Sequence, residues 1–282
     1  MCLFTTMAHA QKPEKVYSII KDLHEKSWYE EQLRLWKIET EKNPKNAEAW
    51  YYYFSASRAL RNLAYGDNDA VQKHQALCDE IAKKMLEVVP NTFEANHIQW
   101  WNGQRTEADI AYLKKAYEIN PNDSRTYTDL MVHYEIIQDQ EQFAQFARKT
   151  FTANEMASAV LNWAYNILAE VDDHSIVFTA GDNDTFSAWT VQGAKNFRKD
   201  VQIINTSLIL LDDYRNKLFE KLGIPTLSIK MTDQTTEESY SKAYKSLFDH
   251  IFKNYKKGSV YISATAIQQF NNWSDSLYLT GL

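Results

Sequence analysis

The sequence predicts two regions of different fold class: all-α helical repeats over residues 11–170, then a small three-layer α/β domain with a mainly parallel sheet over residues 171–282. Up to about residue 170 apolar residues recur at helical spacing, whereas beyond it short β-branched runs alternate with helical stretches. The composition agrees with a helix-rich chain, because 7 Gly and 5 Pro are few breakers and 8 Trp and 17 Tyr supply bulky rings for packing.

The first region is predicted to consist of helical hairpins. Trp50, Tyr53 and Phe54 define one apolar helix face, and Cys78 falls at an apolar position of another, which favours a core residue over a reactive thiol. The breaks between helices are brief and rich in Asn, Gly and Pro; they cover residues 43–46, 66–68, 90–92, 102–103 and 120–123. Such short breaks predict antiparallel neighbours.

Residues 111–134, AYLKKAYEINPNDSRTYTDLMVHY, resemble the junction between tetratricopeptide repeats. Pro121 follows the end of one helix, and Tyr127 and Leu130 take apolar positions of the next. Looser copies surround Pro90 and Pro44, so we expect three to four irregular helix pairs.

A tetratricopeptide array implies a concave groove that binds a peptide or protein segment, although so short an array could instead only support the second region. The candidates to line the groove are four aromatic residues: Trp28, Trp36, Tyr51 and Tyr52.

The second region alternates predicted strands and helices. The strands are expected at residues 175–180, 201–208, 226–231 and 259–265, and the helices at 184–197, 211–222 and 236–256. Because parallel strands with right-handed crossovers place their following loops at one edge, ligands of such sheets bind there. The polar residues expected at this edge are Asp182, Asn183, Asp184, Asn205 and Asp212.

The loop GDNDTF, residues 181–186, carries two carboxylates where a helix begins. Carboxylates at this positive end of the helix dipole would repel a phosphate, and neither GxxxxGK nor GxGxxG occurs, so nucleotide binding is disfavoured. Asp182 and Asp184 suit a hard cation or sugar hydroxyls, and their D-x-D spacing is similar to motifs of glycosyltransferases and haloacid-dehalogenase phosphatases. The favoured alternative is structural, with Asp184 as helix N-cap or Asp182 in an Asx-type turn.

Other stock catalytic patterns are missing from the sequence, which has no HExxH and no GxSxG. We therefore assign no catalytic residue and expect no cofactor, and the sequence leaves metal binding at the loop open.

Residues 160–222, with GDNDTF, Trp189, Gln192 and VQIINTSL, resemble the soluble extracytoplasmic part of a Bacteroidetes family of large membrane proteins of unknown function. That family is itself similar to protein O-mannosyltransferases. The tail SVYISATAIQQFNNWSDSLYLTGL is similar to the same region, while Ser187 and Ala188 stand where the family has Pro and Leu. The resemblance implies an accessory domain outside the inner membrane and does not transfer an enzyme activity.

The first ten residues, MCLFTTMAHA, end in a small-x-small pattern typical of a signal peptidase site, so we interpret residues 1–10 as the remnant of a signal peptide. A formal net charge of −6 without a basic stripe argues against nucleic acid as a partner, and no apolar run is long enough for a transmembrane segment. We therefore expect an exported, periplasmic, non-catalytic interaction or scaffold protein with a protein or peptide partner in the cell envelope. The alternative is a carbohydrate-active or metal-assisted enzyme centred on the GDNDTF loop.

Overall fold

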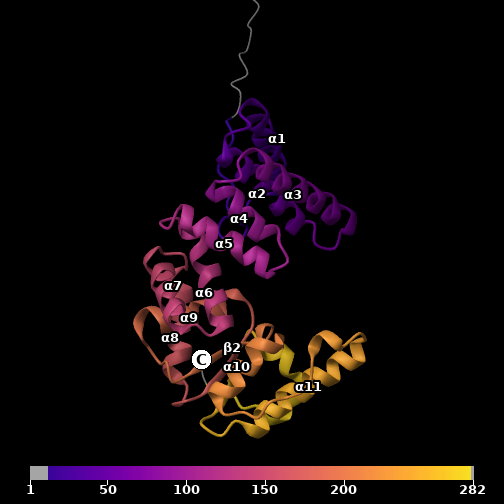
Figure 1. Ribbon diagram of the computed structural model, residues 1–282. Coiled ribbons are helices and arrows are strands. Elements are labelled where there is room, and N and C mark those ends of the chain that lie inside the picture. The colour runs from indigo at the N-terminus through magenta and orange to yellow at the C-terminus, as the bar shows by residue number, and fades with distance from the viewer. Residues whose placement is uncertain (1–11, 281–282) are drawn as a thin grey trace, which may run out of the picture. The chain divides into compact units, whose positions relative to one another are not determined.

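The computed structural model describes residues 12–280 and confirms the predicted fold class: an N-terminal array of helical hairpins is followed by a small α/β region with a three-stranded, all-parallel sheet (Figure 1). The chain forms two compact units, one ending at Thr126 and one beginning at Tyr127. The predicted signal-peptide remnant lies outside the described residues. No helix among residues 12–280 is both long and apolar enough to cross a membrane.

Between residues 12 and 126 the first unit contains five α-helices, which are α1 (Lys26–Lys42), α2 (Ala47–Leu63), α3 (Asn68–Val88), α4 (Phe93–Asn102) and α5 (Glu107–Ile119), and a 3-10 turn, η1 (Ser124–Thr126). Asn46, Asp67 and Thr92, which lie in predicted breaks, begin α2, α3 and α4 by accepting a backbone N–H three residues on. Thr106, just after the predicted break at 102–103, begins α5 in the same way. Helix α2 packs on α1, α3 and α4, and α4 packs on α5. This is the pattern of stacked hairpins.

The core of this unit is unusually aromatic. Tyr29 and Phe54 are fully buried, and the free thiol of Cys78 lies among them, as its helical position predicts. Burial raises the pKa of the Cys78 thiol, so it is a packing residue.

The described part of the second unit, residues 127–280, contains six α-helices and three strands. The helices are α6 (Tyr127–Ile137), α7 (Gln140–Thr152), α8 (Ser158–Glu170), α9 (Asp182–Lys195), α10 (Asp212–Leu222) and α11 (Glu237–Asn254), and the strands are β1 (Ile176–Thr179), β2 (Gln202–Asn205) and β3 (Val260–Ile262). Short 3-10 segments lie at Leu208–Leu210, Met231–Asp233 and Ile267–Ser276. Helices α6 to α8 belong to this compact unit, and the predicted domain limit at residue 170 stays a prediction.

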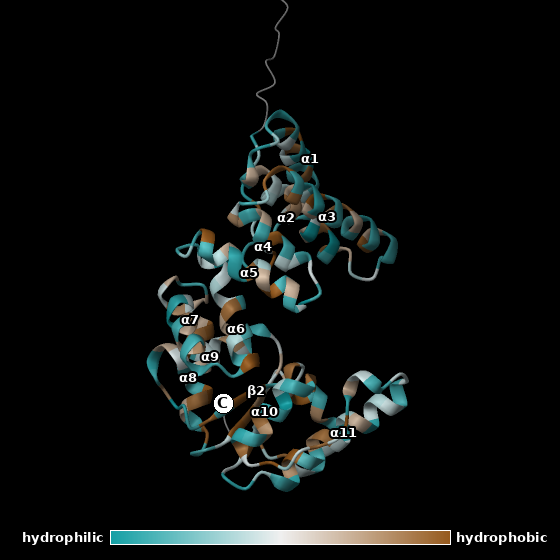
Figure 2. Ribbon diagram, in the orientation of Figure 1, coloured by the Kyte–Doolittle hydropathy of each residue, from teal (hydrophilic) through white to brown (hydrophobic). Residues whose placement is uncertain are grey.

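The sheet order is β2–β1–β3, with both pairs parallel. On one face Ile176 and Phe178 join a core that includes Tyr214 of α10 and Phe248 of α11. Helix α9 packs near the strands too, and the indole Nε1 of its Trp189 donates to a backbone carbonyl of β2. The brown colouring in β2 in Figure 2 marks hydrophobic residues of this strand, and Ile203 and Ile204 are buried.

The predicted strand at residues 226–231 is wrong. Residues 224–230 have no regular secondary structure and do not join the sheet. Alternate residues of this segment do turn inward, with Leu227 and Ile229 half-buried and Met231 buried, which explains the strand-like pattern. The carbonyl of Ile229 accepts from the buried guanidinium of Arg215 at 2.7 Å, so a side chain satisfies a group that a strand would pair with its neighbour.

Candidate functional site

The GDNDTF loop is a tight passage from β1 into α9. Gly181 adopts φ +80°, a conformation that glycine takes without strain, and it is the N-cap residue of α9. No side chain makes an N-cap hydrogen bond there. The prediction that Asp184 is the N-cap is therefore wrong, because the backbone turn at Gly181 starts the helix three residues earlier.

Asp184 instead joins three separate parts of the second unit. Its Oδ1 accepts from the indole Nε1 of Trp163 on α8 at 3.0 Å. Its Oδ2 accepts from the hydroxyl of Ser263 at 2.6 Å and from that of Thr265, both just after β3. The side chain is buried, with 4% of the residue exposed. Donors from within the chain thus engage both carboxylate oxygens.

A second polar network lies under the first turn of α9. The hydroxyl of Thr185 is 2.8 Å from that of Thr179 and accepts from the side-chain amide of Asn205 at 2.8 Å. The Asn205 Oδ1 accepts the backbone N–H groups of Ser207 and Leu208. Asn205 therefore shapes the turn after β2, as Asn side chains commonly do.

Asp212 is engaged elsewhere. Its carboxylate pairs with Arg215, one turn along α10, at 2.7 Å. Arg215 is buried, so this ion pair is a structural contact. The structure brings Asp182, Asn183 and Asp184 together along one pocket, which Asn205 and Asp212 do not line.

That pocket is an open, mainly apolar depression of about 480 Å³, lined by Ala159, Val160, Trp163, Ala180, Gly181, Asp182, Asn183, Asp184 and Thr265. The Asp182 and Asn183 residues are exposed at it, and Trp163 is 41% exposed. Desolvation raises the pKa of Asp182. Free acceptors beside an aromatic ring suit a small polar ligand. No pattern in the sequence indicates Trp163 as a site residue, because it lies in a helix before the first strand.

Residues 12–280 contain no group of three His, Cys, Asp or Glu side chains that could hold an ion.

The four aromatic groove candidates lie in the first unit, whose N-terminal segment, residues 12–19, forms no helix or strand. Trp28 stacks on His24 with ring centres 3.9 Å apart. The Nε1 of Trp36 donates to the backbone carbonyl of Glu14 at 2.7 Å, and its ring contacts that of Tyr52. Trp36 thus contacts the N-terminal segment, whereas Trp28 packs on His24, a residue between that segment and α1.

Tyr51 and Tyr52 are buried in the core of the first unit. The Tyr51 hydroxyl lies 3.4 Å from Nδ1 of the fully buried His97, and the guanidinium of Arg125 covers the Tyr51 ring at 4.4 Å. Arg125 also binds Asp123 at 2.7 Å. Tyr51 therefore belongs to a buried cluster that links α2, α4 and η1.

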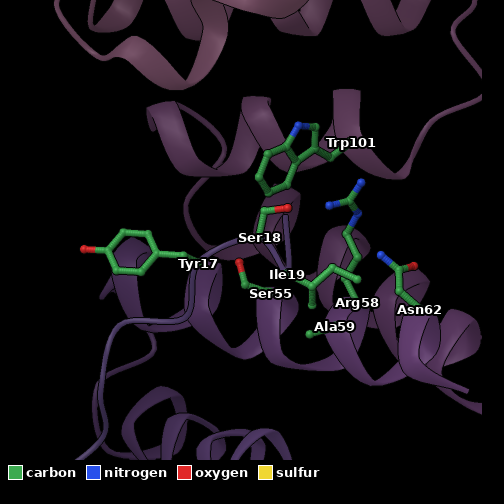
Figure 3. A pocket seen from close by; sticks show the side chains of 8 residues that line it. All are labelled: Tyr17, Ser18, Ile19, Ser55, Arg58, Ala59, Asn62 and Trp101. Atoms are coloured by element: carbon green, nitrogen blue, oxygen red, sulfur yellow. The ribbon is translucent and has the colours of Figure 1, made fainter. Parts of the chain in front are cut away.

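The N-terminal segment closes a small cavity against α2 and α4 (Figure 3). The space, about 10 Å³, is enough for the centre of one water molecule. Its lining comprises Tyr17, Ser18 and Ile19 of the segment, Ser55, Arg58, Ala59 and Asn62 of α2, and Trp101 of α4. The Arg58 guanidinium lies 4.7 Å from the centre of the Trp101 ring.

The chain is thus a helical-hairpin array, with a small cavity under its N-terminal segment, followed by a small α/β region, with a pocket at the GDNDTF loop. Residues 160–280, which start within α8 and include the whole sheet, match the family model of TMEM260-associated domain 2. No curated protein matches the chain. The family match thus concerns the GDNDTF loop, Trp163 and the residues after β3.

Proposed function

We propose that this protein is an exported, non-catalytic interaction or scaffold protein whose helical array binds an extended protein or peptide segment in the cell envelope. One observation carries the proposal: α1, α2 and α4 already hold an extended stretch of chain, residues 12–19, through its backbone and one buried side chain. A surface that holds one extended segment in this way has the chemistry to hold another.

The tetratricopeptide-like character of the array is part of this proposal. The turns that contain Pro44 and Pro90 precede α2 and α4, and these two helices pack on each other across the repeat. In tetratricopeptide arrays such first helices line the concave face. The residues of α2 and α4 beside the N-terminal segment would lie on that face.

The α/β region is proposed to be an accessory domain like that of the O-mannosyltransferase-like membrane family that it resembles. The internal hydrogen bonds of Asp184 support a non-catalytic role, because a carboxylate that accepts three side-chain donors is poorly placed to bind substrate or move a proton. Export and a periplasmic location rest on the small-x-small pattern of residues 1–10 alone.

Photocrosslinking in the intact cell tests the interaction. A photoreactive amino acid at Asn62, an exposed α2 position beside the segment, should give a discrete crosslinked partner. The matched position is Lys83, exposed on α3, where no such product should form. The variant Arg58→Glu should remove the Asn62 product, and Lys83→Glu should leave it. Equal products at both positions, or none, would contradict the proposal.

A second candidate function is small-ligand binding at the GDNDTF pocket, which would underlie the carbohydrate-active or metal-assisted alternative. The exposed Asp182, Asn183 and Trp163 favour it. Its test is thermal denaturation with divalent cations and with nucleotide sugars. A stabilising shift should disappear in Asp182→Asn and persist in Asp275→Asn, an exposed control in the same unit. The absence of any shift across the panel would exclude this candidate.

A further inference from the structure

Residues 12–19 belong to no helix or strand, but they are held against the helices of the first unit. They form no regular secondary structure, yet the backbone of Glu14 is held on both sides. Its N–H donates to Oε1 of Gln32 at 2.7 Å, and its carbonyl accepts from Nε1 of Trp36 at 2.7 Å. Gln32 and Trp36 lie one turn apart on the same face of α1. Two side chains thus capture the backbone of one extended residue, whatever its side chain.

One side chain anchors the segment. Val16 is 2% exposed and belongs to the core cluster of the first unit, and Ile19 packs partly against the same cluster. The side chains on either side of Val16 are more exposed: Tyr17 is 51% exposed, and Lys15 forms an ion pair with Glu48 at 3.5 Å in which both side chains are exposed. A single aliphatic anchor with exposed neighbours is typical of a bound peptide more than of an integral core element.

The fit between segment and surface is incomplete. The Nε2 of Gln32 is buried without a hydrogen-bond partner in the described part of the chain, although Oε1 of the same amide holds Glu14. The small cavity under Tyr17, Ser18 and Ile19 lies between the segment and the side chains of Arg58 and Trp101 (Figure 3). A ligand that offered a carbonyl to Gln32 would satisfy this donor, which residues 12–19 do not.

We propose that residues 12–19 are an internal ligand that occupies a peptide-binding groove on α1, α2 and α4 and can be exchanged for a peptide of the same chemistry. This inference rests on the proposed function. The preferred occupant is an extended segment with a basic residue followed directly by a β-branched aliphatic one, as in Lys15-Val16. The basic residue would pair with Glu48, and the aliphatic one would take the place of Val16. Gln32 and Trp36 of α1 would hydrogen-bond the peptide backbone.

The short tether explains how the groove stays occupied. Residues 20–25 connect the segment directly to α1, so its effective concentration at the groove is on the order of millimolar. A free peptide therefore competes poorly with it. In the wild-type chain a free peptide should bind only weakly until the anchor is removed, whereas a cellular partner that displaces the segment can still reach Asn62.

The test uses the full-length chain with Val16→Asp and a fluorescent peptide that reproduces residues 12–24. The charged Asp side chain cannot take the buried place of Val16, so the segment should leave the groove. Fluorescence anisotropy should show that this variant binds the peptide at least about tenfold more tightly than the wild type does. The matched control is Lys12→Ser, which changes an exposed residue at the start of the segment and should bind like the wild type. A peptide that carries Asp in place of Val16 should not bind, and Trp36→Phe added to Val16→Asp should weaken binding.

Circular dichroism decides whether the segment is separable from the fold. Val16→Asp should retain the helical content of the wild type, and a loss of helix would overturn the inference because residues 12–19 would then be a required part of the core. A folded Val16→Asp that does not bind the peptide would overturn it as well. If the peptide binds but Asn62 yields no crosslinked partner, the proposed function fails while the internal-ligand contact stands. If Asn62 yields a crosslinked partner but Val16→Asp does not bind the peptide, the proposed function stands and the internal-ligand inference fails.

Discussion

Asp184 and Gln32 are both buried polar side chains, one in each compact unit, but their surroundings use them differently. Asp184 accepts hydrogen bonds from Trp163, Ser263 and Thr265, which satisfy both of its oxygens. Gln32 has one satisfied atom, held by the backbone of Glu14, and one buried donor without a partner among the described residues. A buried polar group whose hydrogen bonds are all made within the chain stabilises the fold. A buried donor without a hydrogen-bond partner can instead bind an acceptor on a ligand.

The largest expected effect tests the structural side of this comparison. Asp184→Ala should lower the free energy of unfolding of the second unit by about 2–3 kcal/mol, because it leaves the Trp163 indole and two hydroxyls without their acceptor. Urea unfolding with hydrogen exchange to localise the loss to residues 127–280 measures this. The neighbouring Asn183→Ala, at an exposed residue, should change little, and an equal loss in both variants would refute the proposed role of Asp184.

Buried titratable groups give the two units opposite responses to acid. In the first unit, burial and the nearby Arg125 lower the pKa of His97 to about 3 from a reference of 6.5. The unfolded chain therefore takes up the proton first, and stability falls as pH drops below 6.5. The loss is about 2–3 kcal/mol at pH 4.5.

In the second unit, burial raises the pKa of Glu135, which accepts from the Tyr214 hydroxyl at 3.2 Å. The folded state then holds this proton more tightly than the unfolded chain, so the stability that Glu135 contributes is present in acid and is lost as pH rises above 4.5. Urea unfolding at pH 6.5 and 4.5 separates the two effects. His97→Gln should make the chain less sensitive to acid and Glu135→Gln more sensitive, and slopes identical to the wild type would contradict both assignments.

A smaller effect is expected at the N-terminal segment. Trp36→Phe removes the donor to the Glu14 carbonyl and should cost about 0.5–1 kcal/mol, because water can replace part of this exposed hydrogen bond. Its matched control is Trp50→Phe, which removes a comparable indole bond to the Pro44 carbonyl at 2.9 Å. Trypsin should cleave after Lys15 faster in Trp36→Phe only. Equal cleavage in both variants would mean that Trp36 does not hold the segment.

Residue spacing predicted the helices and three of the four expected strands because helix and strand periods are local properties. The predicted strand at 226–231 was wrong because a loop with alternate buried residues has the same sequence period as a strand. In the structure the side chain of Arg215, not a neighbouring strand, binds the Ile229 carbonyl. The role of Asp184 was beyond such reasoning. Its donors lie 21, 79 and 81 residues away, so no local pattern relates them.

The path of residues 12–19 was equally unpredictable, since nothing in KPEKVYSI marks Val16 as a buried anchor. Trp36 was a groove candidate from its aromatic character alone. Its indole N–H, which holds a backbone carbonyl, is the property that matters in the structure.

The smallest expected effect on stability falls at Asp182, next to the residue with the largest. Its carboxylate is exposed and has no ion-pair partner within the described residues, and desolvation raises its pKa. Ionised Asp182 thus slightly disfavours the folded state at neutral pH, and Asp182→Asn should leave the free energy of unfolding unchanged or raise it by less than about 0.5 kcal/mol. Thermal denaturation at pH 7 measures this directly. A clear loss of stability would mean that Asp182, like Asp184, is tied into the fold, and the GDNDTF pocket would then offer no free carboxylate to a ligand.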